Sequence, residues 1–264
     1  MGRELFLWEV TDGIGTIQLD DPLRLNALTF ETYEKLERLT GALGQDDTVK
    51  VVVITGSGKG FCSGGNVTEI IGELVKMKGE ALYRFTRLTC DLVKNMRNLK
   101  KPIIAAVNGI AAGAGAMLAL ASDIRILSDQ AQFAFLFVKM GLAGADMGAL
   151  YLLPRIVGQG RATELLFLGD TIDAQEAYRI GLANRVVAHE KLLEESSQMA
   201  RRLKEGPLHA LGVTKQLLNL EADMNFEEAL EMEATAQAKC METQDFHEGY
   251  QAFMEKRAPV FNRS

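Results

Sequence analysis

The sequence is poor in the residues that bind metals or crosslink a fold. Its 264 residues include three histidines, His189, His209 and His247, and three cysteines, Cys62, Cys90 and Cys240. The cysteines are far apart and odd in number, which argues against a disulfide framework. Neither residue type has the spacing of zinc ligands. The sequence therefore predicts no metal site.

Long apolar runs and basic clusters are also missing. No apolar stretch approaches the roughly 18 residues of a membrane span. Arg3 and Glu4 precede a short apolar segment that lacks the h-region and cleavage site of a signal peptide. Net charge is −6 with no dense basic run, whereas a nucleic-acid partner would require a basic face. We therefore expect a cytoplasmic protein that binds neither membrane nor nucleic acid.

What the sequence does contain is typical of a globular α/β protein. Hydrophobic residues make up 47% and charged residues 24%, and the chain is long enough for a substantial core. Buried or alternating apolar runs predict strands over residues 5–10, 15–19, 51–55, 102–107, 123–127 and 184–187, the last being the only strand expected after residue 158. Helical periodicity is found over residues 29–43, 79–98, 161–168, 174–180, 191–205, 208–220 and 226–241, and a further helix is expected to end at Pro154.

Two glycine-rich loops each follow a buried strand. The first spans residues 61–66 and the second residues 108–115. Glycine and alanine let a ligand approach the backbone, and N–H groups at a helix start carry partial positive charge. Two such groups aimed at one point would form an oxyanion hole, although either loop alone is equally consistent with a tight strand-to-helix turn. Walker, dinucleotide-binding and nucleophile-elbow patterns are absent.

Several further motifs occur in a characteristic order. They are Asn26-Ala27-Leu28, the segments 104–109, 121–125, 152–158, 174–177 and 181–187, and the terminal segment 253–257. Together with the two loops, this ordered set resembles the crotonase superfamily, also called the enoyl-CoA hydratase/isomerase superfamily. The resemblance extends from about residue 4 to residue 261.

The resemblance implies a fold and an assembly. Residues 1–195 would form a crotonase-like spiral of ββα units that holds an acyl-CoA site, and residues 196–264 a C-terminal helical region that mediates trimerisation. Such trimers often pair, so we expect a homotrimer or homohexamer. Coenzyme A would be part of the thioester substrate, with no separate cofactor.

The resemblance also implies site residues. The thioester carbonyl would lie between the N–H groups of Gly65 and Ala114, which would stabilise the enolate that forms when a proton leaves or a nucleophile adds. The expected coenzyme A contacts are Arg24, Ala27, Ser63, Gly65, Asn66, Val67, Phe253 and Lys256. For Arg24 and Lys256 a solvated surface charge is the alternative. The amide of Asn66 is expected to bind the ligand or to cap the next helix.

The chain departs from the hydratase pattern at two positions. Hydratases of this superfamily use two glutamates, but Met117 and Phe137 occupy those positions here, and neither exchanges a proton. Counted back from segment 152–155, Asp146 matches an aspartate that acts as acid/base in dienoyl-CoA isomerases and a phenylacetyl-CoA isomerase of the superfamily. Apolar surroundings should raise its pKa. The alternative is an N-cap for a helix beginning near Met147.

These residues favour an enoyl-CoA lyase or isomerase with an unusual acid/base. Hydration or dehydration of a branched or cyclic enoyl-CoA is expected first, because hydration is the commoner activity of the superfamily. Double-bond isomerisation by Asp146 as the single acid/base is the alternative, and hydrolysis or carbon–carbon cleavage would use the same oxyanion hole. A catalytically silent acyl-CoA-binding protein is the competing class, whereas RNA binding and NAD-dependent oxidation are disfavoured by charge and by the missing fingerprint.

Overall fold

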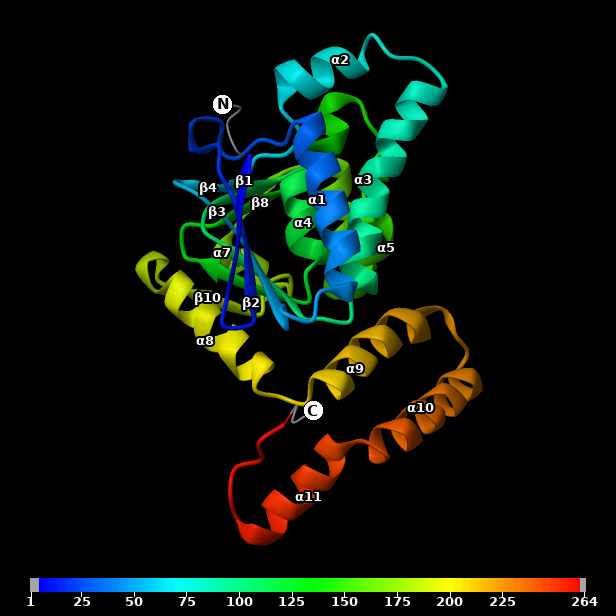
Figure 1. Ribbon diagram of the computed structural model, residues 1–264. Coiled ribbons are helices and arrows are strands. Elements are labelled where there is room, and N and C mark those ends of the chain that lie inside the picture. Colours follow the sequence, from blue (N-terminus) through cyan, green and yellow to red (C-terminus); the bar gives the residue numbers. More distant parts are fainter. Residues whose placement is uncertain (1–4, 262–264) are drawn as a thin grey trace.

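The strands form two sheets in a computed structural model that describes residues 5–261 (Figure 1). Residues 1–4 and 262–264, at the outer ends of the two predicted segments, lie outside the described residues. The larger sheet has the order β1 (Phe6–Thr11), β2 (Ile14–Leu19), β3 (Val51–Gly56), β5 (Ile103–Val107), β7 (Ile124–Ser128) and β10 (Arg185–Val187). The smaller sheet has the order β4 (Gly60–Cys62), β6 (Ile110–Ala112), β8 (Gln132–Ala134) and β9 (Thr171–Asp173).

A ββα unit repeats along the chain and links the two sheets. In each repeat the first strand joins the larger sheet, the second joins the smaller sheet, and a helix follows. The repeats end in α3 (Glu80–Asn98), α4 (Ala114–Ala121) and α5 (Ala149–Val157). Within each sheet, the strands contributed by successive repeats pair in parallel, so successive repeats advance in the same direction. The predicted spiral of ββα units is confirmed.

The central strands are buried on both faces, as their apolar runs predict. Val52 and Ile54 of β3 belong to the main hydrophobic core. Val51 and Val53 point to the opposite face because side chains alternate along a strand. There they pack with α8 (Leu192–Lys204), which contributes Leu192 and Ala200 among others. A helix on each face explains why these strands show no alternation in sequence.

Local signals place the first hairpin and the first helix correctly. Asp12 and Gly13 both have positive φ, 49° and 76°, which suits the tight turn between antiparallel β1 and β2. Helix α1 (Phe30–Ala42) starts after Thr29, whose side chain accepts a hydrogen bond from the Thr32 N–H in a reciprocal capping box. The strands predicted over residues 5–10 and 15–19 and the helix predicted over residues 29–43 are confirmed.

Other sequence predictions require correction. Residues 110–112 of the second loop form strand β6, so this loop is not a simple strand-to-helix turn. Strand β9 contradicts the expectation of a single strand after residue 158. Three-residue strands are too short to show a period of two, so only their pairing defines them. Helix α5 does not end at Pro154 but continues to Val157. The carbonyl left without a donor by Pro154 belongs to Leu150, an exposed residue at which water can replace the lost bond.

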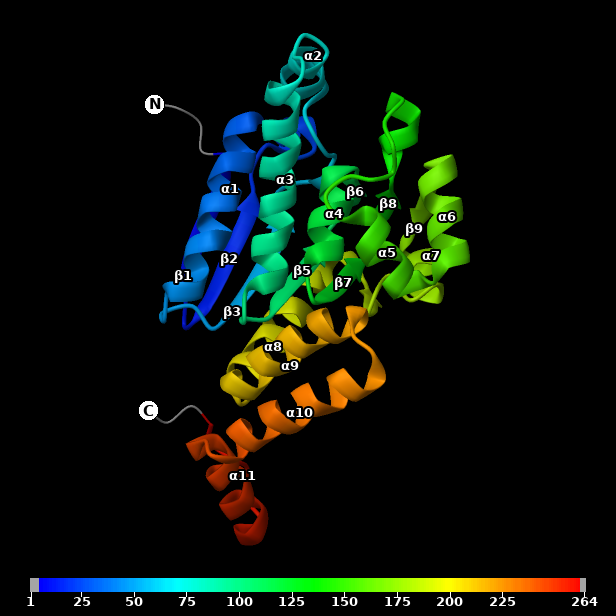
Figure 2. The same cartoon turned by 90° about the vertical axis from the view of Figure 1, so that its right-hand side faces the viewer.

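The C-terminal helices lead away from the sheets (Figures 1 and 2). After α6 (Gln159–Leu168) and α7 (Ala174–Arg179), α8 packs on β3, β5 and β7. The predicted division between residues 195 and 196 falls inside this helix. The remaining helices are α9 (Leu208–Leu220), α10 (Phe226–Met241) and α11 (Gln244–Glu255). Helix α10 buries none of its residues within the chain.

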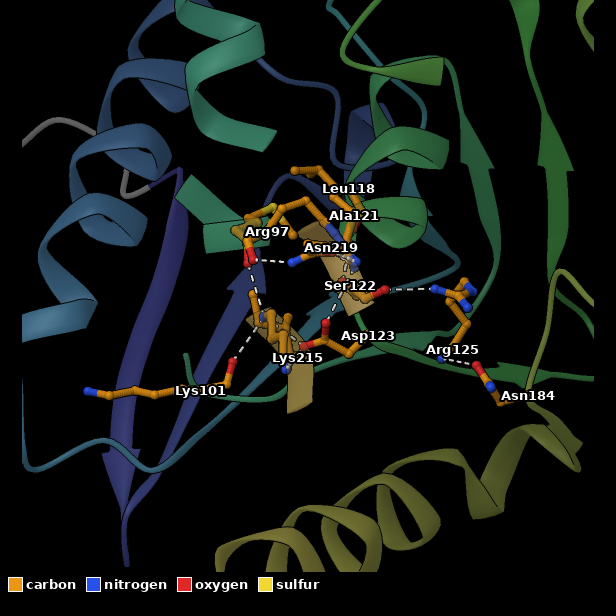
Figure 3. A network of polar contacts seen from close by, with 12 residues as sticks. Arg97, Lys101, Leu118, Ala121, Ser122, Asp123, Arg125, Asn184, Lys215 and Asn219 are labelled. Carbon is orange, nitrogen blue, oxygen red and sulfur yellow. Dashed lines mark hydrogen bonds and ion pairs between the residues drawn. The ribbon is translucent and has the colours of Figure 1, made fainter. Parts of the chain in front are cut away.

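A buried ion pair anchors α9 to the spiral core (Figure 3). The Lys215 ammonium lies 2.8 Å from the Asp123 carboxylate and donates to the carbonyls of Met96 and Lys101 at 3.0 and 3.1 Å. Burial lowers the pKa of Lys215, and the Asp123 charge opposes that shift. Among residues 5–261, no helix is both long and apolar enough to cross a bilayer.

Candidate active site

The two glycine-rich loops are in direct contact. A Cβ atom on Gly64 would lie 2.9 Å from the Ala112 carbonyl oxygen and 3.5 Å from the Ala114 nitrogen. One on Gly115 would lie only 2.0 Å from the Cys62 carbonyl oxygen. Any side chain at these positions would push the loops apart, so glycine is required for their close approach.

The Gly65 N–H is left free by the way its neighbours pair. Gly65 forms an isolated parallel bridge with Leu28. Leu28 donates its N–H to the Gly64 carbonyl at 2.7 Å and accepts the Asn66 N–H at 2.8 Å. In this pattern the N–H of the intervening residue points away from the partner strand. No acceptor for it is found among residues 5–261.

The second free N–H belongs to Ala114. This residue is the first of α4, after Gly113 in a positive-φ conformation as N-cap. The first N–H groups of a helix have no intrahelical acceptor, and the helix dipole makes them partly positive. Because Ala114 adjoins Gly64, the contact between the loops brings the backbones of Gly65 and Ala114 near one another. The predicted pair of residues is therefore brought together.

The positions that carry glutamates in hydratases are buried and apolar. Met117 lies in α4 and is wholly buried. Phe137 lies in the short helix η4 (Leu136–Met140) and is also buried. The nearby Phe133 and Phe135 are fully enclosed core residues, whereas Met140 is half-exposed. Neither Met117 nor Phe137 can move a proton.

Asp146 is not a helix cap, so that alternative is wrong. Helix α5 starts after Gly148, which is its N-cap and has a φ of 81°. No side chain caps this helix start, because the positive φ of Met147 and Gly148 turns the chain away from an ordinary cap geometry. Burial raises the pKa of Asp146 above its ordinary value, and a hydrogen bond from the Met147 N–H partly opposes this rise.

Tyr33 is a site candidate that sequence reasoning missed. It lies one turn into α1, shortly after the Leu28 bridge to the first loop, and is 3% exposed. Its ring packs edge-on against Phe85, with centroids 5.6 Å apart. Burial raises the pKa of Tyr33 strongly, with further contributions from Cys62 and Asp146. The only sequence signal was a hydroxyl on the buried face of an amphipathic helix.

Asn66 and Cys62 have structural roles. The Asn66 side-chain oxygen accepts the N–H groups of Thr68 and Glu69 at 3.0 Å, capping the short helix η3 (Val67–Ile71). The capping alternative is therefore correct for that oxygen, and Val67 is the exposed first residue of η3. Burial raises the pKa of Cys62 to about 12, so its thiol stays protonated near neutral pH and is a poor nucleophile.

Most of the predicted coenzyme A contacts adjoin the first loop. Arg24 ends the short helix η1 (Pro22–Arg24), and its guanidinium lies 3.5 Å from Asp21 and 3.4 Å from Glu69. The Ser63 hydroxyl donates to the Arg24 carbonyl at 3.1 Å, and the Ala27 N–H donates to the same oxygen at 3.1 Å. Arg24 is largely exposed, so its charge is available to a ligand.

Phe253 and Lys256 are not brought to these loops within one chain. Both lie at the end of α11, far from α1 and the loops around α4 (Figure 1). Phe253 is 81% exposed. Sequence motifs placed these residues in one site, whereas the path of the C-terminal helices separates them.

The fold and the contact between the two loops define a class of protein: an α/β spiral in which two glycine-rich loops meet and leave the backbone N–H groups of Gly65 and Ala114 without intrachain acceptors among the described residues. Comparison with known proteins agrees with this class. The family model for enoyl-CoA hydratase/isomerase matches residues 9–264. The chain belongs to this family, the crotonase superfamily, and its relatives bear the names of hydratases, which are lyases, and of isomerases.

Individual relatives cover nearly the whole chain. The 1,2-epoxyphenylacetyl-CoA isomerase of Escherichia coli K12 is 36% identical over 98% of both chains. The crotonyl-CoA hydratase of Syntrophomonas wolfei is 34% identical over 99% of both. A crystal structure from Streptomyces coelicolor A3(2), with a provisional enoyl-CoA hydratase name, is 47% identical, has a TM-score of 0.96, and is matched over 98% of this chain and 94% of its own.

Proposed function

We propose that this protein isomerises an enoyl-CoA thioester. The thioester oxygen accepts hydrogen bonds from the N–H groups of Gly65 and Ala114. These donors stabilise the negative charge that develops on the oxygen as the enolate forms, and one such donor contributes about 3 kcal/mol to the transition state. Support comes from the contact between the two loops and from the free orientation of both N–H groups.

Asp146 is the acid/base of this proposal. Its carboxylate takes a proton from one carbon of the acyl chain, and the electron pair of that C–H bond moves toward the thioester oxygen. The same carboxyl group returns the proton to another carbon, so the double bond shifts and no atom is gained or lost. The observation that carries this choice is the pairing of a raised Asp146 pKa with apolar residues at Met117 and Phe137.

Hydration, which the sequence favoured first, is the second candidate. It is supported by the crotonyl-CoA hydratase of Syntrophomonas wolfei, at 34% identity. It would require one carboxyl group to activate water and to protonate the enolate in turn. A branched or cyclic acyl group remains the substrate proposed for either reaction.

We further propose that the protein assembles as a homotrimer or a pair of trimers. The C-terminal helices expose large apolar side chains, including Leu218, Phe226, Tyr250, Phe253 and Met254. Exposed apolar area of this kind is usual at subunit contacts. In such an assembly Phe253 and Lys256 of one subunit would meet coenzyme A bound to a neighbouring subunit, together with Arg24, Ala27, Ser63, Asn66 and Val67 of that neighbour.

Incubation in D₂O with straight, branched and cyclic enoyl-CoA thioesters, each supplied as the 2-enoyl and 3-enoyl isomer, tests the reaction. Mass spectrometry and chromatography would distinguish the outcomes. A shifted double bond without addition of water supports isomerisation. Addition of water supports hydration, and free coenzyme A supports hydrolysis. Binding without any change in substrate would contradict both proposed reactions.

A further inference from the structure

A short segment, residues 24–28, runs alongside the first glycine-rich loop and is bonded to it on both sides of Gly65. Ser63 is held by two contacts, since its N–H donates to the Leu25 carbonyl at 2.9 Å and its hydroxyl donates to the Arg24 carbonyl at 3.1 Å. Beyond Gly64, the two hydrogen bonds of Leu28 described above continue the pairing. The direction of the Gly65 N–H is therefore set by residues 24–28.

This segment has an unfavourable backbone conformation. Leu25 and Asn26 are consecutive and both have positive φ, 51° and 56°. Residues other than glycine rarely adopt this region, although asparagine does so more readily than most, so the strain lies mainly at Leu25. Such strain persists only where surrounding contacts enforce it, and it is concentrated at functional sites.

The side chain of Asn26 supplies the enforcing contacts. Its amide nitrogen donates to three carbonyl oxygens, at 2.7 Å to Gly60, 2.9 Å to Ser57 and 3.2 Å to Phe61. Its oxygen accepts the Asp21 N–H at 2.8 Å and the Ser57 hydroxyl at 3.3 Å. The residue is 2% exposed, so water does not compete for these bonds. Asn26 thus fastens the strained segment to β4, from which the first loop continues.

We propose that Asn26 is a positioning residue that aims the Gly65 N–H at the thioester carbonyl by fastening residues 24–28 to β4. The inference rests on the proposed function, because it assumes that Gly65 is a donor to the substrate. It goes beyond that proposal by assigning a role in catalysis to a side chain that touches neither the substrate nor Gly65.

Asn108 provides a matched control. Its amide nitrogen donates to Gly60 and Gly58 at 3.0 Å, and its oxygen accepts the Gly56 N–H at 3.2 Å. It therefore binds the same Gly60 carbonyl as Asn26 and is also buried. Its hydrogen bonds reach none of residues 24–28. Loss of either amide should reduce stability, but only loss of Asn26 should misdirect Gly65.

The experiment measures polarisation of a bound carbonyl together with kinetics. Butanoyl-CoA labelled with ¹³C at the thioester carbonyl is bound to the full-length protein and to Asn26→Gly, Asn108→Gly and Leu25→Gly, and the carbonyl stretch is recorded by infrared difference spectroscopy. Asn26→Gly removes the amide while tolerating positive φ. Leu25→Gly relieves strain while keeping the amide.

In the parent protein the carbonyl band should move to lower wavenumber on binding. Asn26→Gly should lose most of that shift and lower kcat by about 10-fold to 100-fold, with a much smaller change in KM. Asn108→Gly and Leu25→Gly should keep most of the shift. Should Asn26→Gly fail to fold, Asn26→Ser, with a shorter polar side chain, should give an intermediate loss.

Two results would overturn the proposal in distinguishable ways. A full band shift and full kcat in Asn26→Gly, with only a lower melting temperature, would show that Asn26 merely stabilises the fold. Absence of any band shift in the parent protein with bound butanoyl-CoA would refute the role of Gly65 itself, and with it the proposed function.

Discussion

Asp146 is a carboxyl group in an unusual place, half-buried in a glycine-rich segment and not used to cap the helix that follows. Burial favours the neutral form of the acid, which explains why its pKa is raised. A raised pKa makes the carboxylate a stronger base, so the same group can take a proton and return it. The same residue should therefore control turnover, its pH dependence and part of the stability.

Replacing Asp146 should abolish most turnover. Asp146→Asn keeps the size of the side chain but cannot exchange a proton, so we expect kcat to fall by about 100-fold or more. Acyl-CoA binding, measured by calorimetry, should persist because the backbone donors remain. Asp170→Asn, at an exposed residue paired with Lys139, is the control and should keep its activity. Full activity in Asp146→Asn would refute the assignment.

The pH dependence of kcat/KM should also identify Asp146 as the general base. As general base, Asp146 acts in its ionised form, so kcat/KM should rise with pH through a pKa above the ordinary value of 3.8. Steady-state rates between pH 4 and pH 9 would locate this limb, and any residual activity of Asp146→Asn should lack it. A rising limb that survives the substitution would assign the base to another group.

The contribution of Asp146 to folding stability should fall as pH rises, whereas kcat/KM should increase. Because the folded-state pKa of Asp146 is raised, the folded chain binds this proton more tightly than the unfolded chain. Its contribution to folding is therefore favourable in acid and is lost as pH rises through the folded pKa. Asp146→Asn should melt at a higher temperature than the parent at pH 7, and the difference should shrink toward pH 4. An unchanged difference across this range would contradict the linkage.

At the scale of elements, the attachment of α9 depends on one buried lysine. The Lys215 side chain of α9 is 7% exposed and forms an ion pair with Asp123, which directly precedes β7 in the spiral core (Figure 3). Asp123 in turn accepts the Ile103 N–H at 2.8 Å, so the ion pair joins α9 to the start of β5. Arg97 of α3 hydrogen-bonds Asn219 of α9 and adds a second contact.

Removing this lysine should loosen α9. Lys215→Met leaves Asp123 with only the more distant Arg97 guanidinium, at 3.4 Å, as a cationic partner, and we expect the free energy of unfolding to fall by about 3 kcal/mol. Amide hydrogen exchange should quicken in α9. Lys191→Met removes an exposed partner of Glu194 and should change stability by less than about 0.5 kcal/mol. Equal effects of the two substitutions would show that burial of Lys215 is unimportant.

At the scale of the whole molecule, the C-terminal helices carry predicted binding residues away from the site of their own chain. If α11 completes a neighbouring site, two inactive variants should rescue one another. Asp146→Asn disables the core of a subunit, and the double change of Phe253→Ala with Lys256→Ala disables its α11. Mixed oligomers would contain sites with an intact core and an intact α11.

We expect co-refolded mixtures of these variants to recover about a quarter of the parent activity, the share of sites that combine two intact halves under random mixing of subunits in a closed ring. Analytical ultracentrifugation should show a trimer or hexamer for the parent and for both variants. A monomeric parent, or a mixture no more active than its components, would contradict the shared site.

The sequence by itself determined the central strands, the first hairpin, the capped helix α1 and the order of motifs that marks the family. These features depend on neighbouring residues: a β-branched run, an Asp-Gly turn, a threonine before an amphipathic helix. The order and spacing of these motifs also predicted Gly65, Ala114 and Asp146 as site residues, because motif spacing can be read from the sequence alone.

Only the tertiary structure decided how the two glycine-rich loops meet. The contact between the loops depends on packing of segments distant in sequence, and short strands such as β4 and β6 exist only through their partners. The Met147 and Gly148 backbone excluded Asp146 as a cap, and the path of α9 to α11 separated Phe253 and Lys256 from the loops. Asn26 could be recognised from the sequence as part of a motif. Its five polar contacts with Asp21, Ser57, Gly60 and Phe61, however, join residues that no local sequence pattern connects.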